Sequence, residues 1–465
     1  MTSFKSAVQN TTVESRTANN MKTYESSLSS VLDLFFAIGS SRGKDIIPQF
    51  EKAYQEDRRL TLRAACWARD VRGGAGERET FRKILSFIEK NHNKEFEQLI
   101  KATPFYGRWD DVLVSQTKEG FDIVAEEVRK ALSQGDGLCA KWMPRKGVYA
   151  VALRKRLNMS PKQYRKTLVT LTNVVEQSMC SGDWSKIVYD HVPSVAAARY
   201  QKAFGKHDPS GYAAYREALT TGDAKVNAGA VYPYDIIKSL RAGGAQEVIK
   251  AQWEALPNYV GDANILPMVD VSGSMACPVG GNANLQCIDV AVSLGLYLAD
   301  KNRGAFKDMF LTFSSKSKIE VLKGDIVSKF AQLSRAHWDM STNLLSAFDE
   351  VLRVASEKRV AQEDMPRYIL ILSDMEFNQC TTYDDSAIEG IRRKYAYSGY
   401  TLPNIIFWTL NARSGNVPVK FDERGTALVS GFSPAIMTSI LKCEAIDPTS
   451  IMLTTLNSER YERIQ

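Results

Sequence analysis

The sequence lacks the features that mark several large classes of protein. No apolar run approaches the roughly 20 residues that a membrane-spanning helix needs, so no such helix is predicted. The first 20 residues, MTSFKSAVQNTTVESRTANN, contain no apolar core of a secretory signal, so we expect a cytoplasmic protein. Seven cysteines are scattered without a CxxC pair, which argues against a disulfide framework and against a zinc site.

Catalytic signatures are missing as well. The chain has no Walker A loop, no dinucleotide-binding fingerprint and no nucleophile elbow, and its four histidines fit no triad or metal-ligand spacing. The adjacent carboxylates Asp110 and Asp111 would be the one acid–base pair, but their position in GRWDDVLV favours a capping role at a helix start. We therefore expect neither an enzyme nor a nucleotide cofactor.

Charge is distributed unevenly along the chain. Residues 1–255 contain 39 Lys and Arg against 29 Asp and Glu, whereas residues 256–465 contain 21 against 24. A basic half joined to a slightly acidic half indicates that the first half meets a polyanion.

The first half is predicted to be helical throughout. Apolar residues recur at spacings of three and four in the segments 27–40, 77–91, 120–134, 160–179 and 232–242. Ser160 and Pro161 are typical of a helix start, with a capping hydroxyl before a proline at the first helical position. Many helices in series favour an all-α, HEAT-like repeat domain, a ring or solenoid, over residues 26–255, after a polar segment 1–25.

The second half alternates apolar, strand-like runs with helical segments. The strand-like runs include NILPMVDV, DMFLTFSS, RYILILSDM and NIIFWTLNA. Near-continuous apolar strands joined by helices predict a mainly parallel sheet that is covered on both faces. We predict an α/β domain over residues 260–465, joined through the Pro- and Gly-containing stretch ALPNYVGDAN and ending in a C-terminal helix that returns to the repeat domain.

Oxygen-bearing side chains follow two of these predicted strands. Asp270, Ser272 and Ser274 share the loop after one strand, and Asp374 follows another. Ligands of parallel α/β sheets bind at the carboxyl ends of the strands, so we expect these groups at one edge. With Thr342, which precedes a helix, they would supply five hard oxygen donors to one divalent cation, Mg²⁺ or alternatively Mn²⁺.

A simpler interpretation gives Asp270 and Asp374 capping roles at helix starts, without an ion. We adopt the metal interpretation because capping does not require all five groups. Cys277 and Cys287 flank the same loop and are interpreted as packing residues rather than soft ligands.

The most basic stretch of the chain runs from Gly137 to Asn173 and contains no acidic residue. Three aromatic residues lie among its cations, Trp142, Tyr149 and Tyr164, and each is individually typical of a core. The nine cations are Lys141, Arg145, Lys146, Arg154, Lys155, Arg156, Lys162, Arg165 and Lys166. Such cations on two adjacent helices and their connection predict nucleic-acid binding, because they attract phosphates and release counterions. The alternative is a solvated helix face whose charges pair with acids from elsewhere.

A Gly-rich turn in ARDVRGGAGERETFR is a second candidate for contact with nucleic acid. Arg69, Arg72 and Arg78 surround its glycines, which let a backbone approach a ligand closely. The amides of the following helix start favour an anion, and Arg72 and Arg78 are the predicted contacts. The alternative is a structural turn in which Asp70 and Glu77 pair with these arginines.

The oxygen-donor set resembles the metal-ion-dependent adhesion site of von Willebrand factor A domains, written D-x-S-x-S with a distant Thr and a distant Asp. A basic helical half followed by such a domain resembles the Ro autoantigen family and the uncharacterised TROVE-like proteins of phages, bacteria and plants. In the Ro family a TROVE module of helical repeats closes into a ring with the A domain. The resemblance implies a partner RNA, either the single-stranded end of a misfolded RNA or a small non-coding RNA.

Two other functional classes stay open. Intracellular A domains often contact AAA+ ATPases or other machines through the bound ion, so the chain would then be a metal-dependent adaptor with a protein partner and no direct role with RNA. A metal-dependent nuclease is a weaker alternative, because one ion in a shell rich in hydroxyls is a poor match to known nuclease sites.

Overall fold

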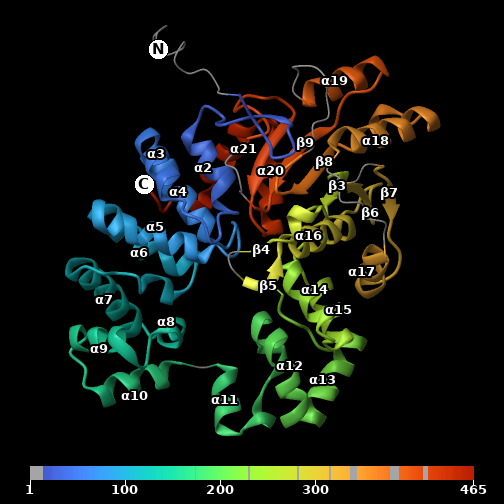
Figure 1. Cartoon of the computed structure of the whole chain (residues 1–465). Helices are drawn as coiled ribbons and strands as arrows, with labels where there is room; N and C mark the ends of the chain where they lie inside the picture. Colours follow the sequence, from blue (N-terminus) through green and yellow to red (C-terminus); the bar gives the residue numbers. More distant parts are fainter. Residues whose placement is uncertain are drawn as a thin grey trace.

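The structure is a computed structural model that describes residues 14–172, 174–228, 231–279, 282–313, 316–335, 343–377, 387–411 and 417–465. Its first part is a series of helices (Figure 1). Their bounds are α2 Ser30–Ile38, α3 Ile47–Glu56, α4 Arg58–Arg69, α5 Arg78–Asn91, α6 Asn93–Tyr106, α7 Lys118–Ser133, α8 Gly137–Trp142, α9 Gly147–Arg156, α10 Pro161–Leu171, α11 Val175–Ser181, α12 Ser194–His207, α13 Pro209–Thr221, α14 Pro233–Arg241 and α15 Gln246–Glu254.

The start of α10 is as predicted, but its end is not. The Ser160 hydroxyl accepts a hydrogen bond from Gln163 N at 3.3 Å, and the Gln163 side chain accepts one from Ser160 N at 2.9 Å. The single helix expected over 160–179 is wrong, because α10 ends at Leu171 and α11 begins at Val175. The break falls in a run rich in β-branched residues, which are poor helix formers, and Thr172 adopts an extended backbone there.

The second part is built on a six-stranded sheet in the order β10-β9-β8-β3-β6-β7. All neighbouring strands are parallel except β6 and β7, so the sheet is mixed, with an antiparallel edge. The strands are β3 Ile265–Asp270, β6 Met309–Phe313, β7 Ile319–Val321, β8 Tyr368–Ser373, β9 Asn404–Thr409 and β10 Thr426–Ser430. The helices are α16 Cys287–Lys301, α17 Ile326–Arg335, α18 Leu344–Lys358, α19 Ala387–Tyr397, α20 Met437–Lys442 and α21 Pro448–Leu456.

Smaller elements complete the described chain. Two hairpins are formed by β1 Glu14–Arg16 with β2 Lys22–Tyr24, and by β4 Pro278–Val279 with β5 Asn282–Gln286. Short 3-10 helices are η1 Trp109–Val112, η2 Trp184–Lys186, η3 Tyr189–His191, η4 Gly273–Ala276, η5 Gln362–Asp364, η6 Pro434–Ile436 and η7 Glu459–Tyr461.

Both ends of the helical series pack against the sheet-containing part (Figure 1). At one end α2 contacts β10 and α21, and α4 contacts α21. At the other end α14 contacts α16, and α15 contacts α17. The two parts share one hydrophobic core, and a smaller cluster around Phe204 and Tyr212 stabilises α12 and α13.

The described part of the chain contains no helix that is both long enough and apolar enough to span a membrane.

Candidate functional site

The carboxyl ends of β3 and β8 bring together four of the five predicted oxygen donors. Asp270 is the last residue of β3, and Asp374 follows directly on β8, the parallel neighbour of β3. Asp270 accepts a hydrogen bond from Ser272 N at 2.9 Å, and the hydroxyl oxygens of Ser272 and Ser274 lie 2.9 Å apart. The fifth predicted donor, Thr342, lies outside the described residues.

Asp270 is buried and shares this edge with a second carboxylate. Burial raises the pKa of Asp270 to about 6, a hydrogen bond from the Ser373 hydroxyl at 2.5 Å opposes the rise, and the negative charge of Asp374 adds to it. Within the described ranges Asp270 forms no ion pair with Lys or Arg. A buried carboxylate beside another is expensive to ionise unless a cation or a proton compensates it.

These oxygen donors match the ligand preferences of Mg²⁺ and Mn²⁺. Carboxylate and hydroxyl oxygens gather at two adjacent strand ends, and a divalent cation would offset the repulsion between the two aspartates. The described residues contain no cluster of three or more His, Cys, Asp or Glu placed to hold a metal, so the candidate rests on two carboxylates supplemented by hydroxyls.

Cys277 and Cys287 lie beside this loop, as the sequence indicates. Their sulfur atoms are 3.4 Å apart, Cys287 is buried and Cys277 is half-buried. They pack against each other at the start of α16 and fit the interpretation as packing residues.

An N-terminal hairpin contacts the loop that follows Asp374, which the sequence did not indicate. The Thr17 hydroxyl donates to Phe377 O at 2.7 Å, and Ala18 N donates to the Glu376 carboxylate at 2.7 Å. Asn19 donates its side-chain amide to Glu376 O at 2.8 Å. The polar segment expected over 1–25 thus includes an ordered element beside the sheet edge. No local pattern could reveal it, because its partners lie about 360 residues away in the chain.

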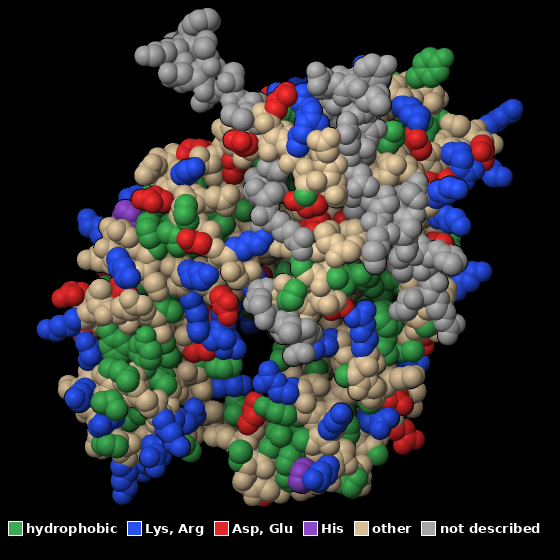
Figure 2. Space-filling model, in the orientation of Figure 1, with side chains coloured by type: hydrophobic (Ala, Val, Ile, Leu, Met, Phe, Trp, Pro, Cys, Tyr) green, Lys and Arg blue, Asp and Glu red, His purple; other side chains and the backbone are tan. Residues whose placement is uncertain are grey.

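The nine predicted cations lie on α8, on the α8–α9 connection, on α9 and on α10, which makes three helices rather than the expected two. We call these nine residues the basic face: Lys141, Arg145, Lys146, Arg154, Lys155, Arg156, Lys162, Arg165 and Lys166. Figure 2 shows Lys and Arg side chains gathered over α9 and α10. Arg156 pairs with Asp122, whereas the other eight have no carboxylate partner in the described part of the chain.

The aromatic residues among these cations are engaged in packing. Tyr164 is buried and donates its hydroxyl to Pro144 O at 3.2 Å, and the ring of Tyr149 stacks on Phe121 with centroids 5.9 Å apart. Trp142 is covered by the guanidinium of Arg108, 3.8 Å from the ring centroid. The structure therefore shows all three in packing roles.

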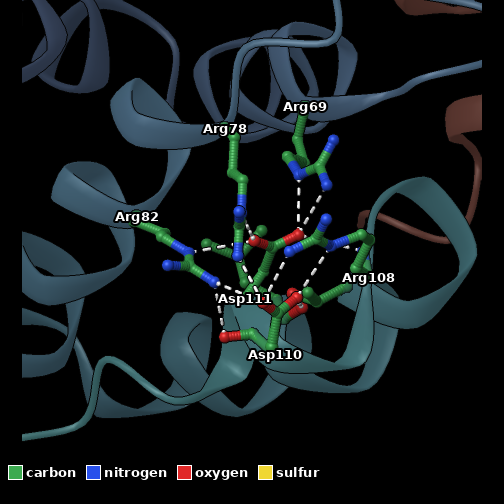
Figure 3. A network of polar contacts seen from close by, with 8 residues as sticks. Arg69, Arg78, Arg82, Arg108, Asp110 and Asp111 are labelled. Atoms are coloured by element: carbon green, nitrogen blue, oxygen red, sulfur yellow. Dashed lines mark hydrogen bonds and ion pairs between the residues drawn. The ribbon is translucent and has the colours of Figure 1, made fainter. Parts of the chain in front are cut away.

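The arginines near the Gly-rich turn join a network with two aspartates (Figure 3). Four arginines from α4, α5 and the start of η1 surround the carboxylates, namely Arg69, Arg78, Arg82 and Arg108 around Asp110 and Asp111. Asp111 also accepts a hydrogen bond from Arg108 N at 2.9 Å, which confirms its predicted capping role. The sequence did not predict the network, because its members are up to 42 residues apart.

The alternative pairing suggested for the turn is wrong. Asp70 pairs with Arg460, and Glu77 accepts two hydrogen bonds from Arg42 at 2.6 and 3.0 Å. Arg78 instead pairs with Asp110 and Asp111, and it keeps about a third of its side chain exposed. Arg72 is exposed and forms no ion pair within the described ranges, so its predicted contact with nucleic acid stays a prediction.

Comparison with known proteins finds matches to both halves. A model for a domain of unknown function, DUF2828, matches residues 17–98 and 122–264, and another, DUF7788, matches residues 264–463. An uncharacterised protein of Acanthamoeba polyphaga mimivirus is 28% identical over 505 residues, covering 95% of this chain and 86% of its own. These descriptions name no activity.

The fold is similar to a solved structure, the Ro protein (RSR) of Deinococcus radiodurans. The TM-score is 0.50 at 16% sequence identity, and the match covers 92% of this chain and 99% of that one. At this level of identity the likeness concerns the fold alone. The protein therefore has a Ro-like fold, in which a helical N-terminal part is joined to a C-terminal part built on a mixed sheet.

Proposed function

We propose that this protein binds single-stranded or small non-coding RNA on the basic face, in the manner implied by its resemblance to the Ro family. The observation that carries the proposal is that eight of the nine cations of this face have no carboxylate partner in the described structure. Like charges gathered without counter-charges repel one another, and phosphates bound in place of small counterions would relieve that repulsion. The role is binding rather than catalysis.

The second part of the proposal concerns architecture. The helical repeats and the sheet domain, which we assign as a von Willebrand A domain, together form a ring. Contacts of α2 and α4 with α21 at one end, and of α14 with α16 at the other, support closure. In this arrangement Asp270, Ser272, Ser274 and Asp374, with Thr342 from outside the described residues, hold Mg²⁺ or Mn²⁺.

Fluorescence anisotropy with a labelled single-stranded RNA tests the RNA proposal on the full chain. A triple variant, Lys162→Ala with Arg165→Ala and Lys166→Ala, should weaken binding about tenfold or more, because three phosphate contacts are lost. The matched control is Arg58→Ala with Lys101→Ala and Lys130→Ala. It removes the same charge, but its three cations already pair with carboxylates, so its affinity should change by less than about threefold.

Equal loss of affinity in the two triple variants would mean that net charge, and not the basic face, determines RNA binding, and would contradict the proposal.

The Asp270→Asn variant distinguishes RNA binding from the adaptor alternative. On our proposal this variant retains RNA binding at the basic face, whereas a protein partner held through the ion would be lost.

A further inference from the structure

A pocket in the helical part has no role in the function proposed above. It lies between α12, α13 and α14 and has a volume of about 770 Å³. Figure 1 places these helices apart from α9 and α10, so the pocket is separate from the basic face. Its volume falls in the range typical of small-molecule sites.

Two buried hydrogen-bond donors of the pocket lining have no acceptor in the described structure. Gln201 is 9% exposed, and its side-chain oxygen accepts from Ala245 N at 3.2 Å, which fixes the orientation of the amide. Its Nε2 is buried and without a partner. Arg216 uses Nη2 to pair with Glu247 at 2.8 Å, while its Nε is also buried without a partner. Buried donors left unsatisfied cost free energy, so the lining favours a ligand rich in acceptors.

The charge of the lining favours an anionic ligand. Arg199, Lys202 and Lys238 line the pocket, are exposed, and form no ion pair within the described residues. Asp235 is the one acidic residue of the lining, and its carboxylate already accepts a hydrogen bond from Tyr232 N at 3.2 Å. Cations therefore outnumber acids in a concave site, where their fields add.

The remaining walls are suited to an organic group. Val195, Ala198, Tyr212 and Val231 contribute apolar surface to the same pocket, which is much larger than a lone phosphate ion needs. We propose that this pocket binds a phosphate monoester of nucleotide size. Its phosphate is held by Arg199, Lys202 and Lys238, and its polar acceptors are met by Gln201 Nε2 and Arg216 Nε.

A phosphate monoester of this kind could belong to a free nucleotide or to the 5′ end of a nucleic acid. Isothermal titration of the full chain with AMP, adenosine, inorganic phosphate, and RNA oligonucleotides with and without a 5′-phosphate separates these sources. We expect AMP to bind at least about tenfold more tightly than adenosine, because charged hydrogen bonds to the phosphate are lost with adenosine. Because the basic face binds both oligonucleotides, the pocket is read from the difference between them: tighter binding of the 5′-phosphorylated one, lost in the pocket variants, would support the pocket and assign the phosphate to an RNA end.

The variants compare two lysines of the same helix. Lys202→Ala, in the pocket, should weaken AMP binding about tenfold, whereas Lys206→Ala, an exposed position that does not line it, should leave the affinity unchanged. Gln201→Leu should also weaken binding. The triple variant of the basic face should bind AMP normally, so this proposal and the proposed RNA function fail separately.

The pocket proposal is overturned if AMP does not bind at millimolar concentration and a 5′-phosphate adds nothing to the affinity of the oligonucleotide. It is equally overturned if adenosine binds as tightly as AMP, or if the two lysine variants have the same affinity.

Discussion

Asp111 shows how much of this structure depends on single buried charges. Burial alone would raise the pKa of Asp111, but the charge of Arg69 and hydrogen bonds from Arg108 and Arg78 hold it below its usual range. Its side chain is fully buried, and it links α4, α5 and η1 through three guanidinium groups, those of Arg69, Arg78 and Arg82. The local sequence pattern could not predict these contacts, because an arginine on an amphipathic helix gives no sign of which distant carboxylate it will pair with.

The Asp111→Asn substitution should lower the melting temperature markedly. Removing one partner of a buried ion pair leaves the buried Arg69 without its carboxylate, whereas Arg78 and Arg82 keep Asp110, and the cost is on the order of 3 kcal/mol. Asp110→Asn is the matched control, because Asp110 keeps 18% of its side chain exposed and should cost less. Differential scanning calorimetry measures both, and equal melting temperatures for the two variants would contradict the central role of Asp111.

The same carboxylate should contribute to stability in a pH-dependent way. Since the pKa of Asp111 is lower in the folded state than in the unfolded state, its contribution is present above the unfolded pKa and is lost as pH falls through the folded one. The gap in melting temperature between the wild type and Asp111→Asn should therefore narrow in acid. A gap that stays constant from neutral to strongly acidic pH would disagree with this explanation.

The sheet-edge oxygens are the part of the site that the sequence predicted best. An aspartate at the end of an apolar strand is visible in the sequence, and parallel pairing of β3 with β8 places Asp270 and Asp374 at one edge. If they hold a cation, added Mg²⁺ or Mn²⁺ should raise the melting temperature, since ligands of the folded state stabilise it. Asp374→Asn should abolish the rise, while Glu363→Gln, on exposed η5, should retain it. A rise that survives Asp374→Asn would exclude this site.

At the scale of elements, segments with apolar periodicity or a clear apolar run could be predicted, and the polar or interrupted ones could not. The helices and the strands β3, β6, β8 and β9 follow from apolar periodicity or continuous apolar runs. Strand β10 is as short as β6, but it begins with Thr426, ends with Ser430 and lies between two glycines, so it lacks a clear apolar run. The polar β1–β2 hairpin is held largely by partners distant in the chain, such as Glu376 and Val417.

The C-terminal segment is an element whose stabilising contacts can be tested directly. Arg460 pairs with Asp70, and Tyr461 donates its hydroxyl to the same carboxylate at 3.0 Å. Arg63 donates to Ile464 O at 2.9 Å and to the Asn457 side chain at 2.6 Å. Through these contacts the C-terminal segment returns to the helical part, as expected from the sequence.

Deleting residues 457–465 should lower the melting temperature, because it leaves Asp70 and Arg63 buried without these partners. Tyr461→Phe should lower it less, since only one hydrogen bond is lost, at a cost of about 1 kcal/mol. Thermal unfolding followed by circular dichroism gives both values. An unchanged melting temperature after the deletion would refute a stabilising role for the segment.

At the scale of the whole molecule, the sequence predicted two parts and the position of their junction. Helix α15 ends at Glu254 and β3 begins at Ile265, close to the expected change of pattern. The sequence did not predict how extensively the two parts contact each other, because the contacts of α2 with β10 and α21 link residues about 400 positions apart. Because the two parts share one hydrophobic core, tests of function require the full chain rather than an isolated helical fragment.

The salt dependence of RNA binding tests the central claim most directly. For single-stranded RNA the logarithm of the binding constant falls with the logarithm of salt concentration, with a slope of about −0.7 for each phosphate contacted. We predict a steep slope for the wild type, and a slope shallower by about 2 for the triple variant of Lys162, Arg165 and Lys166, because three contacts are lost. The control variant of Arg58, Lys101 and Lys130 should match the wild type. A wild-type slope near zero, or a slope that the triple variant leaves unchanged, would contradict RNA binding by the basic face.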